Sequence, residues 1–143
     1  MLFRSRVIDL FDHVSLDLKP EQDLDPPEEL PPLGLGAASE ERAPRTAAEW
    51  SAAREACLAL VAGRDACGKI VVSGERSVDE LAPLLDEVER RAPALPVYLT
   101  PATPVNGATA PSAATLAQLV EMARDRELLV RVLPQVHRLL GLP

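Results

Sequence analysis

The sequence has little cysteine, little positive charge and no long apolar run, and each shortage excludes a class of protein. Its two cysteines, Cys57 and Cys67, are too few for a disulfide framework or a complete cysteine-ligated metal site. We expect them to be semi-buried thiols in a reducing compartment. Only 15 Lys and Arg stand against 22 Asp and Glu, a formal net charge of -7. Because cations must neutralise phosphates, this balance argues against direct binding of nucleic acid.

Membrane and export signals are also missing. No apolar run approaches the roughly 20 residues that cross a bilayer. The first residues, MLFRSRVIDLFDH, do not show the signal-peptide layout, in which a charged start is followed by an apolar middle and a small-residue cleavage site. We therefore expect a cytoplasmic protein without a membrane partner. With 143 residues, 47% of them hydrophobic, the chain suits one packed domain, 1–143.

Residues 20–45 differ in composition from the rest of the chain. This segment, PEQDLDPPEELPPLGLGAASEERAPR, concentrates Pro, Glu, Asp and Gly, which do not sustain helical or strand hydrogen bonding. It predicts a solvated loop inserted into the domain. As an alternative, its PPEELPP part could form a polyproline II recognition segment.

Four segments have the pattern of strands. HVSLDLK, at 13–19, alternates apolar and polar residues with a period of two. KIVVSG at 69–74, PVYLTP at 96–101 and LLVRVLP at 128–134 are short apolar runs that end in small or polar residues, as expected of buried strands.

Three helices are predicted between these strands, each starting at a hydroxyl residue: Thr46, Ser77 and Ser112. Glu49 and Glu80 complete capping boxes at the first two starts, because each stands three residues after the hydroxyl. Gly63 is expected to end the first helix. The apolar residues after Ser77 form one stripe, which predicts a helix of about fourteen residues.

The alternation of strands and helices predicts an α/β fold with a parallel sheet and right-handed crossovers. A small open domain and a piece of a larger barrel both fit this order. In either case ligands belong at the carboxyl ends of the strands. Those ends carry residues 17–19, 73–75, 100–103 and 135–137.

Four segments, VSLDLK, KIVVSGERSVDELAPLLDEV, PVYLTPATP and RVLPQVHRLLGLP, resemble in order and spacing the C-terminal half of 7-carboxy-7-deazaguanine synthases. The last, Arg131 to Pro143, is the most specific. The resemblance implies a partial (β/α) barrel of the radical S-adenosylmethionine type, with about four parallel strands in this C-terminal half. It also implies a carbon–nitrogen lyase that converts 6-carboxy-5,6,7,8-tetrahydropterin to 7-carboxy-7-deazaguanine for 7-deazapurines such as queuosine. The implied cofactors are S-adenosylmethionine, a 4Fe-4S cluster and Mg2+.

The resemblance also implies site residues. For S-adenosylmethionine they are Asp17, Leu18, Lys19, Thr100, Pro101, Ala102 and Thr103. For the pterin substrate they are Gln135, His137 and Pro143, the last through its terminal carboxylate. Thr100 departs from the family, which commonly has Gln there, and this puts one hydrogen bond in doubt.

Each residue also has a plainer interpretation. Asp17 and Lys19 can form a solvated pair at a strand end. His137 can be a satisfied structural histidine beside Leu139 and Leu140, and Gln135 can cap a short last helix.

The CxxxCxxC motif of the family is absent from these residues, and Cys57 and Cys67, ten residues apart, cannot replace it. The resemblance therefore covers nearly all of this chain but only about half of the enzyme. We expect the chain alone to be inactive and an N-terminal half to be its partner. The strand at 13–19 would then be an unpaired edge, which predicts dimerisation or aggregation. The alternatives are a non-catalytic nucleotide- or pterin-binding module and an unrelated small α/β domain.

Overall fold

The computed structural model describes residues 8–23, 44, 46–104 and 108–134. Four strands form one parallel sheet in the order β1-β2-β3-β4: Val14–Asp17, Ala66–Val72, Val97–Pro101 and Val130–Val132. The helices between them are α2, Ala47–Val61, α3, Val78–Arg91, and α4, Ala113–Asp125. A 3-10 turn, η1, occupies Glu21–Asp23 after β1. The predicted α/β fold with a parallel sheet is confirmed.

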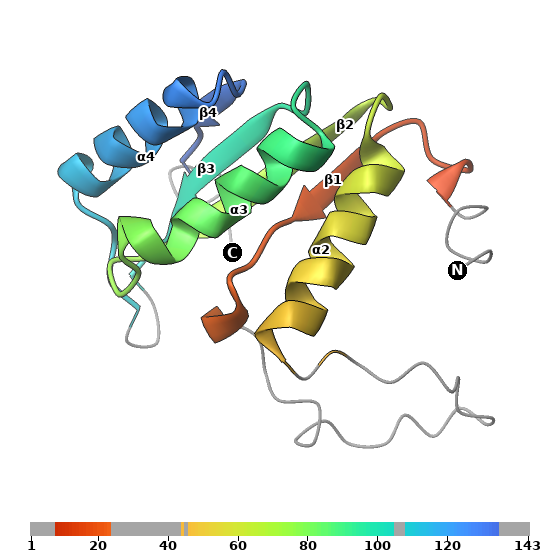
Figure 1. Cartoon of the computed structure of the whole chain (residues 1–143). Helices are drawn as coiled ribbons and strands as arrows, with labels where there is room; N and C mark the ends of the chain where they lie inside the picture. The colour runs from red at the N-terminus through yellow and green to blue at the C-terminus, as the bar shows by residue number, and fades with distance from the viewer. Residues whose placement is uncertain (1–7, 24–43, 45, 105–107, 135–143) are drawn as a thin grey trace.

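Among the described residues, α2, α3 and α4 all lie on one face of the sheet (Figure 1). The strand order follows the chain order, so crossovers of one hand place every helix on the same side. A doubly wound sheet would instead reverse its strand order and carry helices on both faces. Consecutive units of a (β/α) barrel are arranged in the way seen here, although the described strands form an open sheet.

The three predicted helix starts are confirmed as N-caps. The Thr46 hydroxyl accepts the Glu49 N–H at 3.2 Å, and the Glu49 carboxylate accepts the Thr46 N–H at 3.1 Å. Ser77 and Glu80 repeat this reciprocal capping box at the start of α3. Gly63, just after α2, has a φ of 74°, in the left-handed region that favours glycine. Helix boundaries therefore follow from local chemistry.

The core lies between the helices and one face of the sheet. Alternate residues of β2, from Ala66 to Val72, are buried there against leucines of the three helices. The prediction placed this strand at 69–74, but it begins three residues earlier. Pairing with both neighbouring strands overrides the weak strand preference of alanine and glycine. Gly68 suits the position, because a Cβ there would lie 3.3 Å from side-chain carbons of Leu18 and Leu95.

A buried carboxylate joins α2 to α3 and reaches the end of β1. Glu87 is only 3% exposed, and it accepts hydrogen bonds from Arg54 Nε at 2.7 Å, Arg54 Nη2 at 2.8 Å and Ser51 Oγ at 2.7 Å. Such pairing is what a buried charge requires. Arg54 Nη1 also donates to the Lys19 carbonyl at 3.3 Å. The helix layer therefore positions the chain just beyond β1.

The predicted edge strand is confirmed in its position, because β1 is the first strand of the described sheet. Its bounds are shorter than predicted, Val14–Asp17 within 13–19. Most of the predicted loop at 20–45 lies outside the described residues, and its first part contains the η1 turn. No helix among the described residues has the length and apolar character needed to cross a membrane.

Candidate functional site

A row of polar side chains crosses the face of the sheet that α2, α3 and α4 leave uncovered, called here the open face. The strand register aligns Asp17 with Lys69, Lys69 with Tyr98, and Tyr98 with Arg131. Because side chains alternate along a strand, these four point away from the buried core positions beside them. Parallel sheets normally bury both faces under apolar side chains. This polar row therefore identifies the open face as the candidate site.

The polar row contains two cations, Lys69 and Arg131. Lys69 Nζ lies 3.7 Å from Asp17 Oδ1, with side chains 39% and 57% exposed, and an exposed pair of this kind contributes only about 0–1 kcal/mol. Arg131 forms no ion pair with any residue that the structure describes. Tyr98 stands between the two cations in the register, because β3 lies between β2 and β4. Neighbouring strands are about 4.8 Å apart. A planar ring carrying a carboxylate suits this arrangement, since an aromatic side chain stacks on rings and cations bind carboxylates.

The residues predicted at the end of β1 lie together beside α2. Asp17 and Lys19 are exposed, whereas the Leu18 side chain belongs to the core. The Leu18 N–H donates to the Lys69 carbonyl at 2.8 Å, so its own carbonyl is the backbone group left for a ligand. A cavity of about 290 Å³ is lined by Leu16, Asp17, Leu18, Lys19, Pro44, Trp50, Ala53, Arg54 and Cys57.

The residues predicted at the end of β3 do not line that cavity. Thr100 is only 5% exposed, and the Ala102 N–H extends the sheet by donating to the Val72 carbonyl at 2.8 Å. Since β2 separates β1 from β3, the backbone of the residues predicted at the end of β1 lies about 10 Å from that of the residues predicted at the end of β3. A ligand that contacts both must cross β2 beside Lys69, a span that suits a nucleoside with an amino-acid tail.

Three further predicted site residues, Gln135, His137 and Pro143, lie outside the described residues. The predicted contact between the terminal carboxylate and the pterin therefore stays a prediction. So do the plainer interpretations of Gln135 as a helix cap and of His137 as a structural side chain.

The loops after β2 and β3 are joined at the carboxyl edge of the sheet. The Glu75 carboxylate accepts hydrogen bonds from the Thr109 N–H and from Thr109 Oγ1, both at 2.6 Å. The Thr109 hydroxyl, followed by backbone and Ser73 contacts, lowers the pKa of Glu75 to about 2. Gly74 allows the close approach, because a Cβ there would lie 2.8 Å from the Ala110 carbonyl oxygen.

Arg76 joins the segment after β1 to the same edge. Its Nε and Nη2 donate to Asp23 Oδ1 at 2.8 and 2.5 Å, and Nη2 also donates to the Gln22 carbonyl at 3.1 Å. The hydrogen bond that Arg76 donates to Asp23 is the main cause that raises the pKa of Arg76. The loops after three successive strands are thus connected around the open end of the sheet, where ligands bind in parallel α/β folds.

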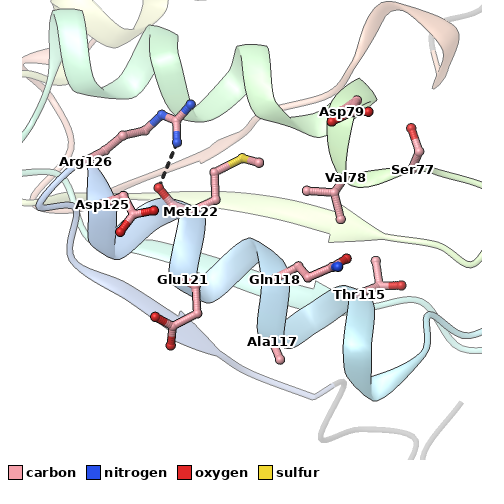
Figure 2. A pocket seen from close by; sticks show the side chains of 10 residues that line it. All are labelled: Ser77, Val78, Asp79, Thr115, Ala117, Gln118, Glu121, Met122, Asp125 and Arg126. Carbon is pink, nitrogen blue, oxygen red and sulfur yellow. Dashed lines mark hydrogen bonds between the residues drawn. The ribbon is translucent and has the colours of Figure 1, made fainter.

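Another groove lies between α3 and α4. Figure 2 shows Arg126, Asp125 and Met122 at one end of it and Ser77 at the other, and its volume is about 910 Å³. Arg126 is already engaged, with the Met122 carbonyl at 2.8 Å and with Asp86 at 2.7 Å. None of the predicted site residues at the ends of β1 and β3 lines this groove. The polar row on the open face is therefore the stronger candidate.

The implied iron–sulfur cluster does not fit these residues. Clusters of this type need at least three thiolates, and the chain has two cysteines, one on α2 and one on β2. Within the described ranges, no group of three or more His, Cys, Asp or Glu could hold a metal ion. Carboxylate-bearing ligands, by contrast, fit the two cations of the polar row.

Sequence reasoning did not single out Lys69, Tyr98 or Arg131. The available signal was the phase of each strand, because all three occupy positions that alternate with core residues.

Comparisons of the chain with protein-family models, curated proteins and solved structures found no match.

Proposed function

We propose that this chain is the C-terminal part of a 7-carboxy-7-deazaguanine synthase, whose open sheet face binds the pterin substrate and S-adenosylmethionine. The observation that carries the proposal is the polar row. Each of the four segments that resemble the family supplies one member of it: Asp17, Lys69, Tyr98 and Arg131. Segments chosen on sequence alone thus converge on one face. In a partial (β/α) barrel that face points inward, and ligands bind at the carboxyl ends of its strands.

The chemistry of the two ligands agrees with the row. The pterin is a bicyclic ring with a carboxylate, and S-adenosylmethionine combines an adenine ring with an amino-acid carboxylate. Tyr98 offers a stacking surface, while Lys69 and Arg131 offer charge-assisted hydrogen bonds. Asp17 and Lys19 are proposed to contact the methionine and ribose part, as the resemblance implies. The role proposed for this chain is to bind and orient, in a complete enzyme whose cluster is held by other residues.

The two-cysteine content favours a second candidate, a pterin- or nucleotide-binding module without catalysis. It would use the same face and the same ligands. Co-expression with the cluster-bearing N-terminal half of a 7-carboxy-7-deazaguanine synthase separates the two. Formation of 7-carboxy-7-deazaguanine supports the enzyme part, and ligand binding without product supports the module. A cytoplasmic location, where thiols stay reduced, belongs to both proposals.

Calorimetric titration of the chain with 6-carboxypterin, a stable analogue of the substrate, tests the site itself. Lys69→Met or Arg131→Met should each weaken binding by roughly ten- to hundred-fold, the equivalent of one charge-assisted hydrogen bond of about 1.5–3 kcal/mol. Arg124→Met is the matched control, because Arg124 is an exposed cation on α4 whose side chain is 68% accessible. Equal affinity in all three variants and the unaltered chain would remove the polar row from the binding site.

A further inference from the structure

Three side chains that the proposed function does not use meet near the amino-terminal edge of β1 and β2. His13 comes directly before β1, Asp65 comes directly before β2, and Cys67 is the second residue of β2. The two strands are parallel, with Val14 opposite Ala66, so the residues that precede them are neighbours. Cys67 occupies the open face one row from Lys69, because side chains on the same face of a strand are two residues apart.

The three side chains form a relay from a thiol to a carboxylate. Cys67 Sγ lies 3.6 Å from His13 Nε2, and His13 Nδ1 lies 2.8 Å from Asp65 Oδ1. A carboxylate at Nδ1 favours the tautomer with its proton on Nδ1, which leaves Nε2 as an acceptor facing the thiol. A nucleophile, a base and a group that orients the base make up the arrangement that activates cysteine and serine nucleophiles.

The described residues around this thiol are partly exposed to solvent. The His13 side chain is 52% exposed and that of Asp65 is 78% exposed, while Cys67 is half-buried. The residue beside Cys67 on β1 is Ser15, which is exposed. Cys57, the other thiol, lines the cavity between β1 and α2 on the helix side of the sheet. The two cysteines are free, and Cys67 alone lies beside a described histidine.

We propose that Cys67, His13 and Asp65 form a reactive thiol site that exchanges with low-molecular-weight disulfides, independently of the proposed function. His13 Nε2 takes the thiol proton, and the Cys67 thiolate attacks one sulfur of the disulfide. A new S–S bond forms on Cys67 as the original S–S bond breaks, and the departing thiolate takes the proton back from His13. The disulfide is the oxidant, and excess thiol reverses the step.

Disulfide exchange suits this site better than acyl transfer does. Acyl transfer develops an oxyanion that needs dedicated hydrogen-bond donors. Disulfide exchange develops no oxyanion, and its rate depends on the thiolate, on access and on the leaving thiol. The relay supplies a proton acceptor and a proton donor in the same imidazole. The half-exposed position leaves room for a small disulfide to approach.

The test is the rate at which oxidised glutathione modifies each cysteine of the full chain at neutral pH, followed by mass spectrometry of peptides. Cys67 should react at least roughly tenfold faster than Cys57, consistent with base assistance. His13→Asn should slow Cys67 by a similar factor while leaving the Cys57 rate unchanged. Cys57 is the internal control, and in denaturant the two rates should converge.

Asp65→Asn is the second variant, and it keeps the inference testable if His13→Asn alters folding. It should slow Cys67 by a smaller factor, because the imidazole remains but is no longer oriented by a carboxylate. Circular dichroism melting curves check that each variant folds as the unaltered chain does. If Cys67 reacts at the same rate in the folded His13 and Asp65 variants as in the unaltered chain, the thiol is merely exposed and the relay is wrong.

Discussion

Removing Arg54 isolates the energetic role of the buried contact between α2 and α3. Arg54→Met leaves the Glu87 carboxylate, whose side chain is only 4% exposed, with the Ser51 hydroxyl as its remaining partner. Loss of one partner of a buried ion pair costs about 3–5 kcal/mol. Arg54 itself is 13% exposed, so some water can reach the vacated space, and we expect the lower end, about 3 kcal/mol. That is a large part of the free energy of unfolding of a typical domain, which is about 5–15 kcal/mol.

The same chain contains a matched control. Arg90 also pairs with a glutamate of α2, Glu55 at 2.7 Å, but its side chain is 53% exposed. Arg91 binds the same carboxylate at 2.6 Å, so Glu55 stays paired when Arg90 is changed. Arg90→Met should therefore cost about 0–1 kcal/mol. Both substitutions remove a guanidinium from the contact between α2 and α3, and they differ in burial and in whether the glutamate keeps an arginine partner.

Urea unfolding of the whole chain, followed by circular dichroism, measures the free energy of unfolding of each variant. The double variant Arg54→Met with Glu87→Leu should recover most of the lost stability, because no unpaired buried charge remains. The reasoning is refuted if Arg54→Met costs as little as Arg90→Met, or if the double variant is as unstable as the single one.

Three further predictions concern pH, the sheet edge and the cluster. The pKa of Glu75 falls from 4.5 to about 2 in the folded chain, so this carboxylate stabilises the fold above pH 4.5 and the contribution is lost between 4.5 and 2. The stability of Glu75→Gln should not show this loss between pH 4.5 and 2. An acid-unfolding curve identical to that of the unaltered chain contradicts the assignment of the lowered pKa to Glu75. The exposed edge at β1 should cause association, and a monodisperse monomer by light scattering across micromolar concentrations argues against it. Anaerobic reconstitution with iron and sulfide should give no cluster absorbance and no cleavage of S-adenosylmethionine, and stoichiometric brown protein would overturn this.

Helix starts were predictable because their chemistry is contained within four residues. The hydroxyls of Thr46 and Ser77 each accept a hydrogen bond from the amide three residues later. The glutamate at that position accepts a hydrogen bond from the backbone N–H of the capping residue, so neither contact depends on the rest of the chain. The start of β2 was not predictable in the same way. Ala66 and Gly68 are of residue types depleted in strands, and they join the sheet through pairing, Ala66 with β1 and Gly68 with both β1 and β3.

The candidate sites depend on register, which sequence patterns do not reveal. Lys69 stands in an apolar run that predicted a buried strand, whereas alternate residues of β2 are only partly buried. Tyr98 becomes the neighbour of Lys69, and Arg131 the neighbour of Tyr98, through pairing between strands whose paired residues are about thirty positions apart. His13 and Cys67 are 54 residues apart, so their contact follows from the alignment of β1 with β2. The predicted half-buried thiols are confirmed, but the histidine beside one of them was not foreseen.

Net charge and local charge lead to different conclusions about binding. The chain carries -7 overall, which argues against a surface for polyphosphate ligands such as nucleic acid. The polar row holds one carboxylate, at Asp17, and two cations, at Lys69 and Arg131, so it is locally positive by one charge. An isolated positive site on an acidic protein attracts a small anion while the surrounding charge repels large polyanions. This contrast supports a carboxylate-bearing metabolite, rather than a nucleic acid, as the occupant of the open face.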